Sequence, residues 1–162
     1  MTDFQELYER YARDLYRFAL YLCGNHADAQ DIVSETFVRA WNAPVSVRAP
    51  TAKAYLFTIA RNYYLPVKRR GRRDTELDED LSDSSPSPHA TVEGKEELTR
   101  VWSALHAMPE LDRSALLMCA VKDMSYAEIA GALRLTVPNV KTKIHRARLK
   151  LAQCRDRAEV QR

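Results

Sequence analysis

The sequence of 162 residues is poor in cysteine and contains no long apolar run. Its three cysteines, Cys23, Cys119 and Cys154, lie far apart and form no C-x-x-C pair, so we expect no disulfide framework. No stretch of about 18 apolar residues occurs, so no membrane-spanning helix is expected. Residues 1–6 are polar and acidic and do not resemble a secretory signal. These absences predict a cytoplasmic protein.

Patterns typical of catalysis and metal binding are also missing. The four histidines share no metal-ligand spacing with one another or with the cysteines. Asp28, Asp31 and Glu35 lie close together, but no nucleophile, metal ligand or glycine-rich phosphate loop accompanies them. The chain is also too short for a barrel enzyme of roughly 250 residues. We therefore expect no catalytic residues, no metal and no cofactor, and an enzyme built on these three carboxylates is the weakest alternative.

Glycine is scarce and no strand-like alternation is sustained, whereas apolar residues recur at helical spacing. Three apolar stripes lie between Phe4 and Tyr63 and predict a three-helix unit, because each stripe must be buried against another. The pattern resumes from Glu93 and predicts four more helices, over residues 98–108, 111–121, 126–133 and 137–152. The predicted fold class is therefore all-α.

The net charge of +3 is the sum of three unlike segments. Residues 1–73 carry 12 Lys and Arg against 7 Asp and Glu, and residues 98–162 carry 12 against 6. Residues 74–97 carry only 1 against 9. Two basic ends around an acidic middle indicate contact with nucleic acid.

The acidic middle also divides the chain. Residues 74–92 are acidic and rich in Ser and Pro. Such a segment cannot bury enough apolar surface to offset the entropy of ordering, which predicts a flexible linker. We expect two small helical domains joined by this flexible acidic linker, with the first over residues 1–73 and the second over residues 93–155. Residues 156–162 are expected to form a short tail.

The second domain carries the pattern of a helix-turn-helix. Ser125 followed by Glu128 is a capping box, which starts a short helix. Residues 133–135 are expected to form the turn, and Thr136 is placed to cap the next helix. Pro138 falls in the first turn of that helix, where a missing N–H costs little.

The second helix of this pair has two unlike sides. Val140, Ile144, Ala147 and Leu151 line one side at helical intervals, and the other side is polar and basic. Such a helix is able to bury one side and insert the other into a major groove. The residues expected to reach base edges are Asn139, Thr142, Lys143 and Arg146, and those expected to neutralise phosphates are Lys141, Arg148 and Lys150. The alternative is a basic helix whose charged side is only solvated.

A polar face and a basic segment stand out in the first domain. Asp31, Ser34 and Glu35 fall on one face of the second predicted helix, which favours a docking surface over a merely solvated face. The third predicted helix leads from several aromatic residues into the basic run of residues 68–73, a combination suited to single-stranded nucleic acid.

The aromatic residues of that third helix divide by their position. Tyr55 and Tyr63 lie on the apolar stripe, so we expect both in the core. Asn62 and Tyr64 lie off the stripe and are the candidates for contact with nucleic acid.

Four segments resemble, in order, those of the sigma-70 family of RNA polymerase factors, extracytoplasmic-function (ECF) type. Residues 28–41 resemble the family's D-A-E-D-L-V-Q-E-T-F-L-R-A-W segment, and residues 54–62 resemble its W-L-F-x-I-A-R-N segment. Residues 108–110 resemble its L-P-E segment, and residues 125–148 resemble its helix-turn-helix. The resemblance implies a transcription initiation subunit without catalysis of its own.

The resemblance also implies partners for each part of the chain. The first domain is expected to dock on the β′ clamp helices of core RNA polymerase and to recognise and melt the −10 element of promoter DNA. The second domain is expected to place its last helix in the −35 major groove and to meet the β flap. The linker is expected to thread the RNA channel, either imitating nucleic acid or acting only as a spacer. An anti-sigma factor is a further expected partner.

The resemblance implies site residues at the positions that match the family's motifs, and we include residues next to those positions. Core polymerase docking is expected at Asp31, Ser34, Glu35 and Arg39. Contact with the −10 element is expected at Asn62, which matches the residue lining the family's base pocket, and around it at Arg61, Tyr64, Lys68, Arg69 and Arg70. Contact with the −35 element is expected at Pro138, Asn139, Lys141, Thr142, Lys143 and Arg146.

Three residues depart from the family pattern. Ser34 replaces the usual Gln and shortens that contact. Pro66 stands where Asp is common, and a proline inside a helix clashes with the carbonyl four residues earlier, so we expect a kink or an end near residues 64–65. Arg134 stands where the turn often has Gly, so it is strained if that position requires a positive φ.

The main alternative is a stand-alone helix-turn-helix regulator that binds an operator, with residues 1–72 as a partner-binding module. The polar face on the second predicted helix, joined to the segment around Asn62, argues against it. Co-purification with core polymerase separates the two hypotheses, because an operator-binding protein has no need of core polymerase.

Overall fold

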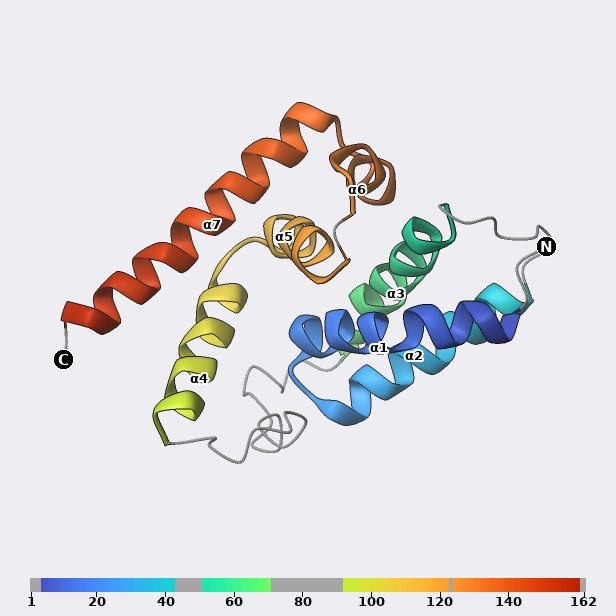
Figure 1. Ribbon diagram of the computed structural model, residues 1–162, viewed down its shortest axis with the longest axis horizontal. Helices are drawn as coiled ribbons and strands as arrows, with labels where there is room; N and C mark the ends of the chain where they lie inside the picture. Colours follow the sequence, from blue (N-terminus) through green and yellow to red (C-terminus); the bar gives the residue numbers. More distant parts are fainter. Residues whose placement is uncertain (1–3, 43–50, 71–91, 123, 161–162) are drawn as a thin grey trace.

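The computed structural model describes residues 4–42, 51–70, 92–122 and 124–160. These form seven α-helices and, within those ranges, no strand, which confirms the predicted all-α class. The helices in Figure 1 are α1 (Phe4–Cys23), α2 (His26–Trp41), α3 (Thr51–Arg70), α4 (Val92–Ala107), α5 (Glu110–Lys122), α6 (Tyr126–Leu133) and α7 (Val137–Val160). Nearly all of the predicted linker, residues 74–91, lies outside the described residues.

Helices α1, α2 and α3 pack together as a three-helix unit. Leu15, Phe18 and Phe57 are fully buried in its interior, and the ring centroids of the two phenylalanines are 4.9 Å apart. Burying one such side chain contributes about 1.5–3 kcal/mol, so the apolar stripes stabilise the unit. The Asn25 side chain starts α2 by accepting a hydrogen bond from the Asp28 N–H at 3.0 Å.

The local chemistry of α6 and α7 follows the sequence pattern. The Ser125 hydroxyl accepts a hydrogen bond from the Glu128 N–H, and the Glu128 carboxylate accepts one from the Ser125 N–H, both at 3.1 Å. The Thr136 hydroxyl accepts one from the Asn139 N–H at 3.3 Å. Arg134 ends α6 in the left-handed region, at φ 56° and ψ 46°. The position therefore does require a positive φ, and the side chain of Arg134 adds strain there.

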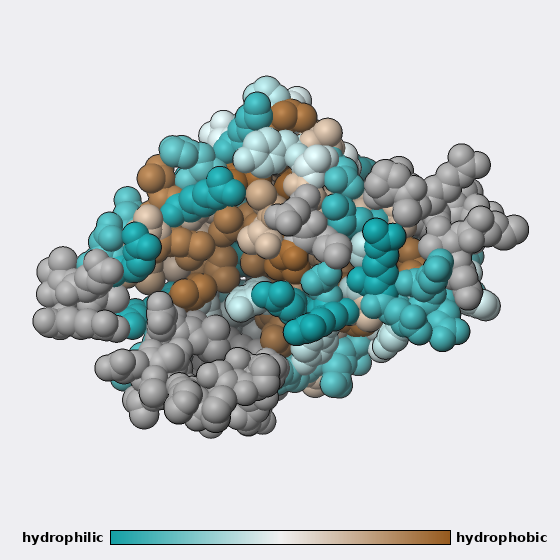
Figure 2. Space-filling model, viewed as in Figure 1, coloured by the Kyte–Doolittle hydropathy of each residue, from teal (hydrophilic) through white to brown (hydrophobic). Residues whose placement is uncertain are grey.

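The two halves of the chain pack against each other (Figure 1). Helix α1 contacts α5, α3 contacts α6, and buried residues of both halves form one apolar cluster. Trp102 of α4 lies over Gly24 in the turn between α1 and α2, where an added Cβ would fall 2.1 Å from the indole ring. Gly24 also has a φ of +75°, so both the space and the backbone require glycine. In Figure 2, apolar residues gather at the middle of the face, over α5 and between α4 and α7.

Two helix ends differ from the sequence prediction. The sequence predicts that the third helix kinks or ends near residues 64–65. The predicted end is wrong, because α3 continues through Pro66 to Arg70. A proline removes one backbone hydrogen bond, but its fixed φ is compatible with a helix, so the chain continues. Helix α7 runs to Val160, past the predicted end at residue 152 and into the expected tail. Apolar periodicity cannot mark the end of a helix whose last turns extend beyond the packed core.

Candidate nucleic-acid interface

Helix α7 presents a polar side to solvent opposite a buried side. Val140, Ile144 and Ala147 are at most 1% exposed, as expected from the apolar stripe, and Leu151 is half-buried. The exposed candidates for DNA contact are Pro138, Asn139, Lys141, Thr142, Arg146 and Arg148, whereas Lys150 is half-buried. Lys143 is half-buried, so it lies at the edge of this accessible side.

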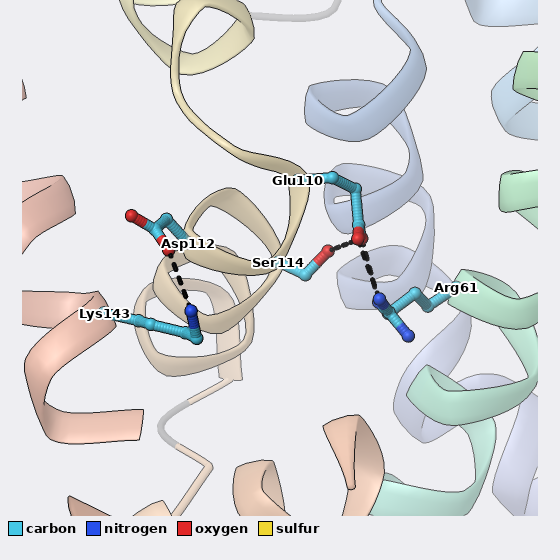
Figure 3. A network of polar contacts seen from close by, with 5 residues as sticks. All are labelled: Arg61, Glu110, Asp112, Ser114 and Lys143. Carbon is cyan, nitrogen blue, oxygen red and sulfur yellow. Dashed lines mark hydrogen bonds and ion pairs between the residues drawn. The ribbon is translucent and has the colours of Figure 1, made fainter. Parts of the chain in front are cut away.

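A buried carboxylate on α5 lies against two of these cations. Asp112 is 1% exposed, with Oδ1 3.5 Å from Nζ of Lys143 and Oδ2 3.3 Å from Nε of Arg146. Figure 3 shows Lys143 reaching from α7 to Asp112. No sequence pattern indicated this contact, because the residues are distant in the chain and only the packing of α5 on α7 joins them.

The expected polymerase-docking residues lie along the outer side of α2. Asp31 and Ser34 are exposed, and the Glu35 carboxylate accepts a hydrogen bond from Nε of Arg39 at 3.0 Å. The guanidinium of Arg39 also lies 5.1 Å from the ring centroid of Tyr63. The Glu35–Arg39 pair is 38–49% exposed, so it contributes little to stability and remains open to a partner.

Sequence reasoning missed two apolar residues beside this polar face. Val38 is 53% exposed and Trp41 is 67% exposed, although Trp41 falls at helical spacing on the apolar stripe of the second predicted helix, with Phe37 and Ala40. The Trp41 ring packs at its edge against Phe4, with centroids 4.7 Å apart. Val38 does not fall on the apolar stripe of this helix, and that position is the sequence signal that could have identified it as exposed.

Two of the expectations for the aromatic residues of α3 are wrong. Tyr64, expected off the core, is 4% exposed, and Tyr55, expected in the core, is 37% exposed. Tyr63 is half-buried and Asn62 is exposed. The reason is that Tyr64 lies beside Arg113 of α5 in the second half, a neighbour that the periodicity of one helix does not predict. The side chains of Lys68, Arg69 and Arg70, also expected at the −10 element, lie outside the described residues.

Arg61, an expected DNA contact, is paired with the second half of the molecule. Its guanidinium donates two hydrogen bonds to the Glu110 carboxylate, at 2.9 and 2.8 Å, and the Ser114 hydroxyl donates another at 2.6 Å (Figure 3). Burial raises the pKa of Glu110, but the hydrogen bonds from Arg61 and Ser114 and the nearby positive charges outweigh it, so the net pKa is lowered. The pair therefore joins α3 to α5 by a charge-assisted, two-pronged contact.

Two more contacts join α3 to the second half. Burial raises the pKa of Tyr64, and the Arg113 guanidinium beside it opposes part of that increase. Arg113 is itself 1% exposed and donates a hydrogen bond to the Leu105 carbonyl at 3.4 Å. Lys53 lies 3.8 Å from the Glu128 carboxylate of α6. The surface expected to meet the −10 element is thus covered at Arg61 and Tyr64 in this arrangement.

The described residues show no arrangement typical of an active site. Within them, no three His, Cys, Asp or Glu side chains gather in a group that could hold a metal ion. Burial raises the pKa of the Cys23 thiol to about 12, so it is not a nucleophile at neutral pH. No helix in the described ranges has both the length and the apolarity to cross a membrane.

Comparison with protein families gives two matches along the chain. The family model described as Sigma-70 region 2 matches residues 7–74, and the one described as Sigma-70, region 4 matches residues 98–151. The first covers α1–α3, and the second covers the helix-turn-helix of α6 and α7 with the helices before it.

Curated relatives agree with these matches. The ECF RNA polymerase sigma factor SigM of Bacillus subtilis is 32% identical over 151 residues, which cover 90% of this chain and 91% of SigM. The ECF RNA polymerase sigma factor SigE of Mycolicibacterium smegmatis is 32% identical over 156 residues, which cover 93% of this chain. The chain spans 61% of the length of that SigE.

Two solved structures are similar over nearly the whole chain. The sigma factor RpoE of Bartonella quintana, in complex with the anti-sigma factor NepR, has a TM-score of 0.70 at 26% identity, covering 96% of this chain and 98% of RpoE. CnrH in complex with the cytosolic domain of CnrY also has a TM-score of 0.70, at 28% identity, covering 94% of this chain and 87% of CnrH.

Proposed function

Because the chain belongs to the ECF RNA polymerase sigma factors, we propose that it binds core RNA polymerase and directs it to a subset of promoters. The observation that carries this proposal is that the region 2 and region 4 matches cover the two helical halves in order. Sigma factors are transcription initiation factors and not enzymes, which agrees with the expectation from the sequence. Its place of action is then the cytoplasm.

The polymerase-docking surface is the outer side of α2. Its polar part is Asp31, Ser34, Glu35 and Arg39, which the family pattern assigns to the β′ clamp helices. Val38 and Trp41 add exposed apolar area directly beside it. An apolar anchor within a polar surround is a common organisation of protein interfaces.

The −35 element is read by the polar side of α7, with Pro138, Asn139, Lys141, Thr142, Lys143 and Arg146 at or near the DNA. The capped helix α6 and the tight turn at Arg134 hold this helix in place. Its exposed residues include both donors for base edges and cations for phosphates. The same domain meets the β flap.

The −10 element is contacted by α3, with Asn62 at the base pocket and Arg61, Lys68, Arg69 and Arg70 along the DNA backbone. Arg61 and Tyr64 are covered by the second half in the described arrangement. Promoter melting therefore requires the two halves to separate. The acidic linker, which lies outside the described residues, provides the length for that separation and acts either as an RNA-channel mimic or as a spacer.

An anti-sigma factor is the partner that regulates the chain. The support is the similarity to two sigma factors solved in complex with the anti-sigma factor NepR and with the cytosolic domain of CnrY. Both similarities extend over more than nine-tenths of this chain, so they span both halves.

The test is run-off transcription with core polymerase and the full chain on genomic fragments. We expect specific transcripts that core polymerase does not give without the chain. Asp31→Ala combined with Glu35→Ala is expected to weaken core binding about tenfold, since it removes two charges from the docking surface. The control is Glu6→Ala combined with Asp156→Ala, which removes two exposed carboxylates elsewhere. A chain that binds promoter fragments but not core polymerase would instead be the stand-alone regulator.

A further inference from the structure

Asp112 is a carboxylate that the packing of the second half has buried against the DNA-reading helix. It lies in the first turn of α5, where the helix dipole favours a negative charge. Neither of its oxygens has a hydrogen-bond partner of good geometry among the described residues. Lys143 and Arg146, at 3.5 and 3.3 Å, are the charges that compensate it. Since an uncompensated buried carboxylate is costly, both cations are held toward α5.

The two cations are held to different degrees. The Lys143 side chain is 21% exposed, whereas that of Arg146 is 51% exposed. Asp112 meets Arg146 at Nε. A guanidinium is a rigid plane, so an ion pair at Nε draws one edge of it toward α5 and leaves the two terminal nitrogens for another partner. Arg146 therefore keeps an accessible edge while its Nε is drawn toward Asp112, and Lys143 is mostly withdrawn from solvent.

The two acidic residues in the first turn of α5 contact two different helices, α3 and α7. Figure 3 shows Asp112 turned toward Lys143 of α7 and Glu110, two residues earlier, turned toward Arg61 of α3. The contact of Asp112 lies within the second half, so it does not depend on how the two halves are placed. It therefore persists when the halves separate on a promoter.

We propose that Asp112 is a positioning residue for −35 recognition, which holds Lys143 against α5 and presents the guanidinium edge of Arg146 to a guanine in the major groove. The inference rests on the proposed function. A pre-oriented Arg forms a bidentate contact with guanine at a lower entropic cost than a mobile one. The same carboxylate offsets one positive charge near the DNA, so it lowers the sequence-independent attraction to phosphates.

The experiment measures base discrimination by the complete chain. Holoenzyme is assembled from core polymerase and the wild-type chain or Asp112→Asn, and transcribes a set of promoter fragments that differ at single −35 base pairs. We expect Asp112→Asn to lose about tenfold in discrimination at one or two adjacent base pairs. Its DNA binding should also depend more steeply on salt, by about one unit of slope. The matched control is Asp156→Asn on α7, which removes the same charge from an exposed position and should keep the wild-type profile.

A double-mutant cycle separates positioning from a general loss of structure. In an Arg146→Ala background, Asp112→Asn should cause no further loss of discrimination, because its effect acts through Arg146. A further loss at the same base pairs would overturn the proposal. Circular dichroism checks that each variant keeps its helices.

If Asp112→Asn does not fold, the wild-type chain still provides a test. The Nζ amine of Lys143 should react with an acylating reagent more slowly than that of the exposed Lys141, because the ion pair with Asp112 holds it against α5. Equal reaction rates would overturn the proposal.

The outcomes separate this inference from the proposed function. An unchanged −35 profile in Asp112→Asn, with normal discrimination by wild-type holoenzyme, overturns the positioning role and leaves the sigma-factor function in place. A wild-type chain that supports no promoter-specific transcription overturns both.

Discussion

Trp41 has the largest exposed fraction of the large apolar side chains in the described residues, at 67%. Its ring is not loose, because it packs edge-on against Phe4. It lies in the last turn of α2, seven residues after the exposed Ser34, so the two side chains share one side of the helix. A fixed aromatic ring at the edge of a charged face has the features of an interface anchor.

We predict that Trp41→Ala weakens binding to core polymerase about 30-fold, which corresponds to about 2 kcal/mol for an anchor residue. The measurement is a titration of labelled chain with core polymerase. Leu149→Ala is the control, since Leu149 is also an exposed apolar residue, at 49%, but lies on α7. A thermal melt of both variants checks that neither unfolds. Equal affinity of Trp41→Ala and wild type would remove Trp41 from the docking surface.

The helix-turn-helix is the element whose geometry depends most on one backbone conformation. Arg134 closes α6 with a left-handed φ of 56°, and the Leu135 N–H then donates to the Ala130 carbonyl at 2.9 Å. A residue with a Cβ is destabilised by about 1–3 kcal/mol in the left-handed region, and glycine carries no such strain. The exposed Arg134 side chain does not take part in the core.

We predict that Arg134→Gly raises the free energy of unfolding by about 1 kcal/mol, because relief of strain exceeds the entropy that glycine adds to the unfolded chain. Urea denaturation of the full chain measures it. Arg134→Ala keeps the Cβ in the left-handed region and should give no gain. A destabilised Arg134→Gly would show that the arginine side chain contributes a contact that outweighs the strain.

Local chemistry made the helices of this element predictable. Ser125, Glu128 and Thr136 act on backbone groups a few residues away, so their pattern predicted α6 and the start of α7. The burial of Tyr64 and the ion pairs of Asp112 depend on helices brought together from distant parts of the chain. Periodicity within one helix carries no information on which second helix will cover it. The family pattern located the docking face, but not the exposure of Trp41.

At the scale of the whole molecule, the two halves are joined by polar contacts at the expected −10 surface. Glu110 receives two hydrogen bonds from Arg61 and one from Ser114, which lower its pKa below the ordinary value of 4.5 despite its burial. A carboxyl with a lowered folded pKa stabilises the packed arrangement above pH 4.5. That stabilisation is lost as the pH falls through the folded pKa, below 4.5.

We predict that Glu110→Gln opens the chain at neutral pH, because the uncharged amide weakens the pairing with Arg61. Small-angle scattering should give a larger radius of gyration for Glu110→Gln than for wild type. A compact wild-type chain is expected to have a radius of gyration of about 15 Å. Wild type should expand only below pH 4.5, and Glu110→Gln should lack that acid-dependent step. The control is Glu6→Gln, an exposed glutamate of α1. Identical radii for Glu110→Gln and wild type at neutral pH would show that apolar packing closes the molecule without this pair.

The placement of Trp102 over Gly24 gives the molecule an internal optical reporter. Of its two tryptophans, Trp41 is 67% exposed and Trp102 only 3%. The centroid of the Trp102 ring lies 3.6 Å from that of the His106 ring. Separation of α4 from the turn between α1 and α2 would move this indole into water and shift its fluorescence to longer wavelengths. In a Trp41→Phe chain, the emission would come from Trp102, so opening and closing of the two halves can be timed without an attached dye.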